Sequence, residues 1–338
     1  MDELAARRRK FFARAAFRSA LFYSGDDAGR PSPGFQYFSG CAIDSSYLLL
    51  RPGSGAILTH EMNLRMAKAV SRYPVKLLGR DAAGDIRRAT GRGKVGFVFG
   101  EAAASRFLAL KKRAKLRLVE ADGKAFEARG GKSAGEDETI AKSAKIAKGI
   151  LDGLDPWEFR TEQELASKLK IAALGAGADI SFEPIVASGR NTSYPHHSPT
   201  GKKLGDAVLV DFGVRVKGYC SDFTRCYFRK KGTKEEKTYL ECREVFEEIL
   251  ERLPECKKGR DVSRLSEKLM AKHGLPRLVH AIGHGVGLEV HEYPHLGKSS
   301  RDSLEGAVLA IEPAAYFKSF GVRFEGMVAN TGKGWQKI

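Results

Sequence analysis

Two predicted β-hairpins, each with a pair of acidic residues among apolar neighbours, constrain the fold of this chain more than any other feature. The first is DAVLVDFGVRVKGYCSDFTRCYF, residues 206–228, in which a turn at Val216-Lys217 would place Asp211 directly opposite Asp222. Their Cβ atoms would lie about 5 Å apart, where two like charges destabilise a strand pair. Exposed acids on a solvated face are the simpler interpretation, but AVLVDFGV is apolar on both faces and indicates burial. A buried carboxylate needs a partner, so we expect positive charge between the two acids.

The second predicted hairpin, GAVLAIEPAAYFKSFGVRFEGMV at residues 306–328, repeats this arrangement. A turn centred on Lys318-Ser319 sets Glu312 opposite Glu325, again among apolar residues. Four carboxylates and an imidazole nitrogen form the ligand set expected of two divalent cations bridged by carboxylate. Two such ions polarise a carbonyl group and generate hydroxide near neutral pH. The paired acids therefore indicate a site for two metal ions.

Two zinc-like patterns occur in GHGVGLEVHEYPH, residues 283–295, and they cannot both hold a metal. His291 to His295 fits H-E-x-x-H, a motif that binds zinc when both histidines share one face of a helix. Pro294 disfavours that helix because it lacks an N–H and its ring collides with the preceding turn. The residues VGLEV before it alternate like a strand. We therefore predict that His284, between two glycines, is the metal ligand, and we assign no role to His295.

The first third of the chain alternates short apolar runs with helical stretches, which predicts an α/β domain with a layered sheet. The expected strands are 42–50, 55–60, 75–79, 94–100 and 115–120, and the expected helices are 61–73 and 101–113. A change of composition at residues 127–138 marks a hinge to a second domain. In that domain helices are expected to begin near residues 134, 161, 233 and 261.

Composition argues against several classes of protein. The net charge is +17, but the Lys and Arg residues are spread along the chain, and no aromatic stacking pattern accompanies the densest run, LKKRAKLRL at 110–118. We therefore expect a basic exterior rather than a nucleic-acid site. No apolar run approaches the ~20 residues that span a membrane, so no membrane association is expected. Five cysteines without a C-x-x-C pair favour reduced thiols and a cytoplasmic location.

The chain resembles the pita-bread metallopeptidases, the superfamily of methionine aminopeptidases and Xaa-Pro peptidases. The motifs VDFGVRVKGYCSDFTR, HAIGHGVGLEVHE, LAIEPAAY and GVRFEGMV carry the resemblance, in the order of the family, over about residues 130–338. The first 125 residues are similar, far less specifically, to the amino-terminal domain of Xaa-Pro peptidases and creatinase. The resemblance implies an α+β fold, in which residues 1–125 form a smaller α/β creatinase-like domain and residues 126–338 form the catalytic pita-bread domain.

The resemblance also implies five metal ligands and two divalent ions per chain, with Mn or Co preferred to Zn or Fe. Asp211 would bind one ion, Asp222 and Glu325 would bridge the pair, and His284 and Glu312 would bind the other. A metal-bridged hydroxide would attack the scissile carbonyl, and Glu312 would accept the proton of the bridging water as a general base.

Three further histidines and one arginine match residues that act on the substrate in this family. His280 and His291 would hold the substrate and stabilise the tetrahedral intermediate or shuttle its proton. His196 matches the upstream active-site histidine, although the adjacent His197 is an alternative at this position. Arg323 matches a residue that orients the site.

The same resemblance favours one activity over its relatives. His280, four residues before the metal histidine, favours an Xaa-Pro peptidase over a methionine aminopeptidase. Gly326 stands where the family usually has Asp, which puts a contact that supports the ligands in doubt. We expect an Xaa-Pro dipeptidase, or prolidase, that acts on small proline-containing peptides and forms a homodimer. The alternatives are an Xaa-Pro aminopeptidase acting on longer peptides, a methionine aminopeptidase, and a metal-free binding protein on the same fold.

Overall fold

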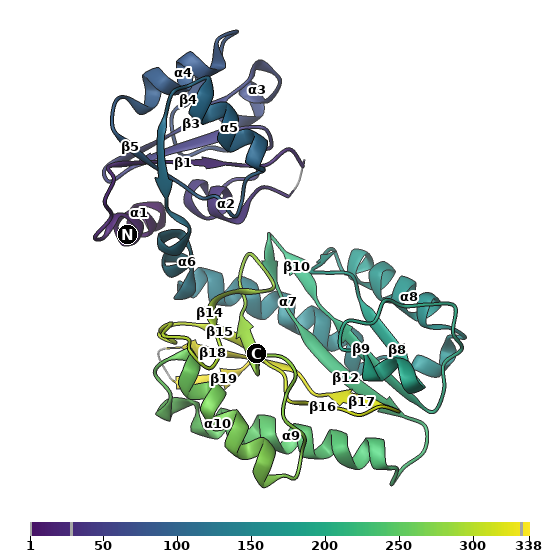
Figure 1. The fold of residues 1–338 in the computed structure, drawn as a ribbon. Coiled ribbons are helices and arrows are strands. Elements are labelled where there is room, and N and C mark those ends of the chain that lie inside the picture. Colours follow the sequence, from purple (N-terminus) through teal and green to yellow (C-terminus); the bar gives the residue numbers. More distant parts are fainter. Residues whose placement is uncertain (1, 28–29, 332–333) are drawn as a thin grey trace. The chain divides into compact units, whose positions relative to one another are not determined.

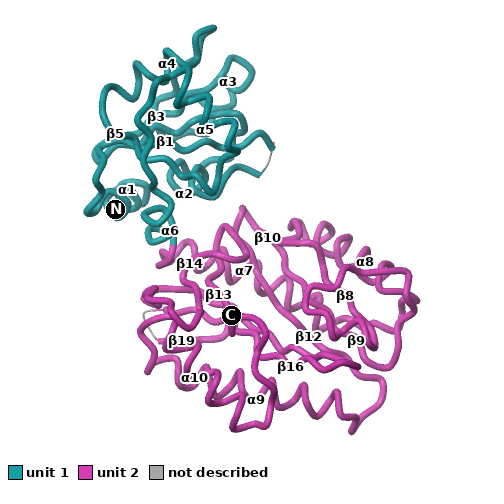
Figure 2. The backbone as a smooth tube through the Cα atoms, viewed as in Figure 1, with its two compact units in different colours: residues 1–129 teal, residues 130–338 magenta. Residues whose placement is uncertain are grey.

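The computed structural model describes residues 2–27, 30–331 and 334–338 of the chain (Figure 1). It divides into two compact units, residues 1–129 and 130–338 (Figure 2). The division lies four residues after the domain boundary expected from the sequence, which was residue 125. The reason is that helix α6 (Asp122–Gly130) runs on through the expected boundary.

The first unit contains one mixed sheet of six strands in the order β4-β3-β2-β1-β5-β6. Its strands are β1 (Ser19–Tyr23), β2 (Tyr47–Arg51), β3 (Ser54–Thr59), β4 (Val75–Leu77), β5 (Lys94–Phe97) and β6 (Arg117–Glu120). Its helices are α1 (Glu3–Phe12), α2 (Pro33–Ser39), α3 (Glu61–Val70), α4 (Ala82–Thr90), α5 (Ala104–Lys112) and α6. Each of the five strands expected here overlaps a strand of this sheet, and both expected helices overlap α3 and α5.

Both faces of this sheet are covered, as the complete burial of the mainly apolar strand β1 shows. Successive side chains of a strand point to opposite faces. Phe22 packs on one face against Phe11 and Phe38, with ring centroids 5.4 and 4.8 Å apart. Leu21 belongs to the core on the other face, together with Leu49 of β2. A strand buried on both sides reads as a continuous apolar run, which explains SALFY.

The second unit contains several small sheets and four long helices. Its helices are α7 (Ala134–Asp152), α8 (Glu162–Gly175), α9 (Lys234–Arg252) and α10 (Gly259–Lys272), with short 3-10 turns at Pro156–Glu158, Gly189–Ser193 and Leu253–Glu255. Its strands are β7 (Asp179–Ile180), β8 (Ile185–Ser188), β9 (Ala207–Phe212), β10 (Val214–Val216), β11 (Tyr219–Cys220), β12 (Phe223–Phe228), β13 (Gly283–Gly285), β14 (Glu292–His295), β15 (Val308–Ile311), β16 (Ala314–Tyr316), β17 (Gly321–Arg323), β18 (Gly326–Thr331) and β19 (Gly334–Lys337).

Two apolar cores hold these helices against the strands. Helices α7 and α8 pack on one core with strands such as β8 and β9. Helices α9 and α10 pack on the other with strands such as β15 and β18 (Figure 1). The metal-site candidates lie on strands or strand ends that belong to both sets, so the two packed halves together fix their positions.

The first hairpin has a different register from the one expected. Val216 pairs with Tyr219, so the turn is at Lys217-Gly218, and both of these residues have positive φ, 49° and 89°. A two-residue turn of this kind favours glycine at its second central position and matches the twist of the strands. Asp211 therefore lies opposite Thr224, and the prediction that it faces Asp222 directly is wrong. Asp222, two residues before Thr224, is a diagonal neighbour of Asp211 on the same face.

The second hairpin has the expected register. Ile311 pairs with Gly326 on one side of the acids, and Ala314 pairs with Arg323 on the other. Both pairs place Glu312 opposite Glu325, which confirms the predicted register. The acids themselves lie at the ends of strands β15 and β18, where the two-stranded ladder is interrupted.

The segment His291–His295 is not helical. Residues 292–295 form β14, which pairs antiparallel with β13. This confirms that the two histidines of H-E-x-x-H do not share a helical face. His295 is exposed and lies 2.9 Å, through Nδ1, from Asp302 Oδ2. No helix among the described residues is long and apolar enough to cross a membrane.

Candidate metal centre

Three buried carboxylates from three different strand segments meet in the second unit. Asp211 lies on β9, Asp222 immediately before β12, and Glu325 immediately before β18. Each offers an oxygen atom, and these atoms all lie within 4.8 Å of one another. The three residues are only 8%, 4% and 2% exposed. Such a cluster of buried carboxyl groups is stabilised either by bound cations or by protonation.

His284 and Glu312 complete the cluster. Together with Glu325 they form a second group of potential ligand atoms within 4.8 Å of one another. His284 Nε2 lies 3.5 Å from Asp222 Oδ2 and 3.9 Å from Glu325 Oε1. All five residues named as ligands from the resemblance therefore lie together. Glu325 belongs to both sets of potential ligand atoms, the one with Asp211 and the one with His284.

The hydrogen bonding of His284 leaves one ring nitrogen available to a metal. Its Nδ1 lies 3.2 Å from the Gly285 carbonyl oxygen, to which an N–H at this position would donate. This arrangement leaves Nε2 as the lone-pair nitrogen that faces the carboxylates. Burial, and secondarily His291, lower the pKa of His284 to about 3. The imidazole is therefore neutral at physiological pH, as a metal ligand must be.

Burial raises the pKa of three carboxyl groups of the cluster. Burial is the largest cause of the raised pKa of Asp222 and of Glu325, and neighbouring carboxylates add to it. Burial also raises the pKa of Glu312 to about 7. Asp211 Oδ1 and Asp222 Oδ1 are buried without a hydrogen-bond partner among the described residues. Oxygen donors with unused lone pairs and one neutral imidazole fit hard or borderline divalent cations.

Arg323 supplies positive charge to this cluster and contacts Asp211 directly. Its Nη2 donates to Asp211 Oδ2 over 2.7 Å, and its Nε donates to the Thr224 hydroxyl over 2.9 Å. Thr224 in turn donates to Glu325 Oε2 over 2.7 Å. The Arg323 Nη1 also contacts the Tyr316 hydroxyl at 2.7 Å. Arg323 therefore fixes one carboxylate directly and a second through Thr224.

Sequence reasoning missed Thr224 and Tyr316. Thr224 is opposite Asp211 only in the observed register. Predicting the turn at Lys217-Gly218 would therefore have identified Thr224 as the neighbour of Asp211. Tyr316 lies on β16, four residues after Glu312. The register predicted for the second hairpin already pairs Tyr316 with Gly321. The hydrogen bond between Tyr316 and Arg323 was not predictable, because a contact between two side chains produces no repeating pattern in the sequence.

Two of the predicted substrate histidines lie beside the carboxylates. His280 Nδ1 is 3.7 Å from Glu312 Oε2, and its buried Nε2 has no hydrogen-bond partner among the described residues. The rings of His291 and His284 are 4.2 Å apart and nearly perpendicular. His291 also forms a potential ligand group with Asp222 and His284. Burial lowers the pKa of both His280 and His291.

The structure places His196 and His197 in different surroundings. His196 is exposed, and it is one of the causes that lower the pKa of His280 and His291, after burial in both cases and also after Arg323 for His280. His197 Nε2 instead lies 2.9 Å from Glu162 Oε2, at the start of α8. His196 is thus the histidine of this pair that lies near the other two.

Glu162 is a third residue that sequence reasoning missed. It is completely buried and accepts hydrogen bonds from the backbone of Ser188 and from the side chain of Asn191. Both the backbone N–H and the hydroxyl of Thr200 donate to it as well. These contacts attach both ends of the loop that carries His196 to helix α8. The sequence showed Glu162 only as part of a helix-capping pattern.

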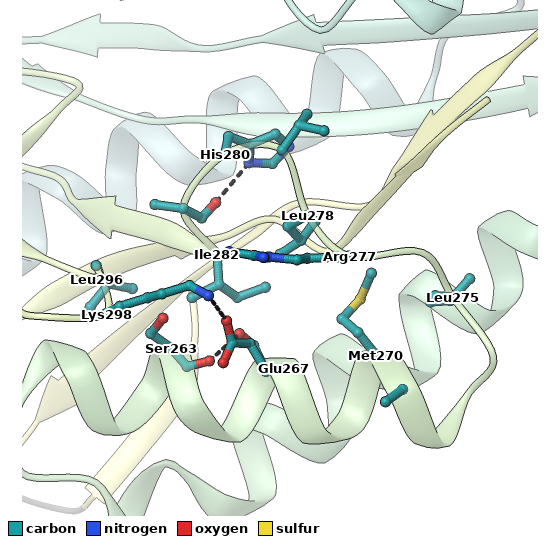
Figure 3. Close-up of a pocket in the computed structure, with 15 residues that line it drawn as sticks. Ser263, Glu267, Met270, Leu275, Arg277, Leu278, His280, Ile282, Leu296 and Lys298 are labelled. Atoms are coloured by element: carbon teal, nitrogen blue, oxygen red, sulfur yellow. Dashed lines mark hydrogen bonds and ion pairs between the residues drawn. The ribbon is translucent and has the colours of Figure 1, made fainter. Parts of the chain in front are cut away.

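A cavity of about 640 Å³ adjoins His280 (Figure 3). Its floor is formed by α10, including Met270, and its other wall by the segment 275–282. An ion pair between Lys298 and Glu267 crosses one side of it. His280 lines this cavity and lies 3.7 Å from Glu312, whereas none of the five potential metal ligands lines it.

Comparison with known proteins gives consistent matches. Residues 137–331 match the family model of metallopeptidase family M24. An uncharacterised peptidase of Methanocaldococcus jannaschii is 34% identical over 60% of this chain and 61% of its own length, so that alignment spans less than two thirds of the relative. An Xaa-Pro dipeptidase of Pyrococcus horikoshii is 29% identical over 91% of this chain and 90% of its own length. The solved structure of an Xaa-Pro dipeptidase from Bacillus anthracis has a TM-score of 0.86 at 25% identity and covers 99% of this chain and 96% of that one.

The solved structure extends over both units of this chain. Its likeness therefore confirms the predicted α+β fold class, a pita-bread domain that follows a smaller α/β domain of the creatinase type. The family match lies within the second unit, where the carboxylate cluster is found.

Proposed function

The chain belongs to metallopeptidase family M24, and we propose that it is a dinuclear metal-dependent exopeptidase that hydrolyses the bond before proline. Its preferred substrates are Xaa-Pro dipeptides. The observation that carries this proposal is the cluster of five potential ligands with three histidines nearby. Relatives named as Xaa-Pro dipeptidases match almost the whole chain and support the choice of substrate.

Five residues would hold the metal ions: Asp211, Asp222, His284, Glu312 and Glu325. The ions would be Mn or Co in preference to Zn or Fe, since the donors are mainly carboxylate oxygens. Bound ions of this kind polarise the scissile carbonyl and lower the pKa of water so that it can attack near neutral pH.

The protein's own groups would move the proton and hold the peptide. Glu312 accepts a proton from the attacking water and returns it to the proline nitrogen as that nitrogen leaves. His280, 3.7 Å from Glu312, and His291 hold the peptide carbonyl and stabilise the charge that develops on its oxygen. His196 contacts the substrate from the opposite loop. Arg323 keeps Asp211 and, through Thr224, Glu325 in place.

Two further features belong to the same proposal. All five cysteines are free thiols, which supports a reducing, cytoplasmic location. A homodimer is proposed from the family resemblance.

An Xaa-Pro aminopeptidase is the second candidate. Under this candidate, the cavity of about 640 Å³ that His280 lines would hold the peptide residues that extend past His280. The two activities differ in the space that they need beyond the proline of the substrate, because only an aminopeptidase must accept a peptide that continues past proline.

Turnover of an Xaa-Pro dipeptide and of the matching Xaa-Pro-Xaa tripeptide, after loading with Mn²⁺ or Co²⁺, distinguishes the two. Faster cleavage of the dipeptide is expected, and faster cleavage of the tripeptide would assign the aminopeptidase activity. Metal content is measured on the same samples. Binding of fewer than one ion per chain, together with absence of Xaa-Pro hydrolysis, would overturn both candidates.

A further inference from the structure

A second cavity in the carboxy-terminal unit, of about 360 Å³, contains two arginines. It lies among α7, α9, β12 and the last two strands, and we call it the Arg225–Arg243 cavity. Its walls include the aromatic rings of Phe246 and Phe324 and the side chain of Tyr239. These three rings contact one another in sequence, with centroids 5.9 and 5.1 Å apart.

The cavity is separate from the carboxylate cluster because of strand geometry. Successive side chains of a strand point to opposite faces. On β12, Thr224 contacts Glu325 in the cluster, while the neighbouring Arg225 lines the cavity. On the second hairpin, Arg323 and Glu325 belong to the cluster, while Phe324 lines the cavity.

Arg225 is held in a fixed orientation that leaves donors unused. Its Nη1 donates to the carbonyl oxygens of Thr224 and Glu325, over 2.9 and 2.6 Å. Its guanidinium carbon lies 4.8 Å from the centroid of Phe324 and 5.6 Å from that of Phe223. The backbone and these rings therefore immobilise the guanidinium, while Nε and Nη2 make no hydrogen bond within the described residues. A guanidinium ordered in this way loses little entropy when it binds an anion.

The cavity has an excess of positive charge. Lys148 is paired with Asp152, and Lys337 with Glu247. Neither Arg225 nor Arg243 has a carboxylate within 4.0 Å among the described residues, although both line the same space. Among the lining side chains, four are cationic and two are carboxylates.

We propose that the Arg225–Arg243 cavity binds a phosphate group. Phosphate carries between about one and a half and two negative charges at neutral pH, so the two guanidinium groups without a carboxylate partner would attract it. Its oxygens accept the paired N–H groups of a guanidinium, the arrangement in which arginine binds phosphate most strongly. Gly326 also lines the cavity, and a Cβ atom there would meet the Phe246 ring at 2.9 Å. Glycine at this position therefore leaves the aromatic wall undisturbed.

The test is calorimetric titration of the metal-loaded protein with inorganic phosphate at constant ionic strength. We expect saturable binding, weakened about tenfold or more by Arg243→Gln, because a charged hydrogen-bond donor is lost. Arg243→Lys keeps the charge but not the paired N–H groups, and an intermediate loss is expected. Arg264→Gln, on the exposed side of α10 and outside the cavity, is the matched control and should bind phosphate as the parent does.

Three results would overturn the proposal. One is the absence of saturable binding at millimolar phosphate. Another is an equal loss in Arg243→Gln and Arg264→Gln, which would indicate attraction to a basic surface. The third is full binding in Arg243→Gln, which would place the phosphate elsewhere, for example on metal ions. Peptidase activity measured without phosphate should be the same in both variants, so failure of this proposal is separable from failure of the proposed function.

Discussion

Arg323 donates a 2.7 Å hydrogen bond to Asp211 although the two residues are 112 positions apart in the chain. Both are buried, and the same guanidinium also contacts Thr224 and Tyr316. Asp211 thus depends on this one guanidinium for its charged partner, and this has consequences for the stability of the metal-free protein.

Replacing Arg323 with Leu should destabilise the metal-free protein by about 3–5 kcal/mol, because it leaves the buried carboxylate of Asp211 without its partner. Arg323→Lys, which keeps the charge, should lose less. Urea unfolding of both variants and the parent measures the effect. The deficit of Arg323→Leu should shrink when divalent ions are added, since these supply positive charge to the same carboxylates. An unchanged free energy of unfolding in metal-free Arg323→Leu would contradict this account.

Glu312→Gln is expected to retain metal while losing most of its activity. The amide oxygen can still contact an ion, but the side chain can no longer accept a proton, and loss of a general base lowers rates by about 10²–10⁴-fold. Metal content and turnover of an Xaa-Pro dipeptide are measured on the same preparation. Glu305→Gln, an exposed glutamate in the same region, serves as the control and should remain active. Full activity in Glu312→Gln would remove this residue from the proton path.

Asp222→Ala should lose both metal and activity, which separates it from Glu312→Gln. Asp222 belongs to two of the three groups of potential ligand atoms and is 4% exposed. Removing it takes away an oxygen donor at the centre of the cluster, so each ion would lose affinity. Metal content after loading, followed by turnover, checks the prediction. If Asp222→Ala retained full activity, the bridging role assigned to this residue would be wrong.

The sequence predicted which residues gather at this site better than it predicted their arrangement. The register of the second hairpin was correct because its apolar residues alternate symmetrically about the turn. In the first hairpin a turn one residue earlier fits the apolar pattern equally well, and only the preference for glycine after Lys217 selects the observed register. Contacts such as that of Arg323 with Asp211 depend on tertiary packing, and no repeating pattern in the sequence predicts them.

Short elements were also missed, for physical reasons. Helices α2, α4 and α6 have seven to nine residues, and each contains a glycine, so their apolar periodicity is weak. Helix α10 begins at Gly259, two residues before the expected start at Asp261. Asp261 accepts a hydrogen bond from the Lys258 N–H. It therefore lies in the first turn of the helix and is not the N-cap residue, which is Lys258.

Glu162→Gln should weaken substrate binding through the loop that carries His196. The carboxylate accepts hydrogen bonds at both oxygens, and an amide would turn one acceptor into a donor that faces other donors. We expect a loss of about 1–3 kcal/mol in stability and a higher KM, with a smaller effect on kcat. Glu158→Gln, an exposed substitution near the same helix end, is the control. A loss of stability with KM unchanged would leave Glu162 with a purely structural role.

His273 should make stability depend on pH, because it bridges helices α9 and α10. Its Nδ1 lies 2.6 Å from Glu241 and its Nε2 lies 2.7 Å from Glu248, and these contacts, the one to Glu241 first, raise the pKa of His273. Lys272 also contacts Glu248 and is the largest cause of the lowered pKa of that carboxyl. A histidine with a raised pKa in the folded state stabilises the protein fully below its unfolded pKa of about 6.5, and this contribution is lost as pH rises through the folded value. The free energy of unfolding of the parent should therefore exceed that of His273→Gln more at about pH 6 than at about pH 9, as measured by urea unfolding at the two values. A difference between parent and variant that stayed constant with pH would show that His273 is not protonated between the two helices.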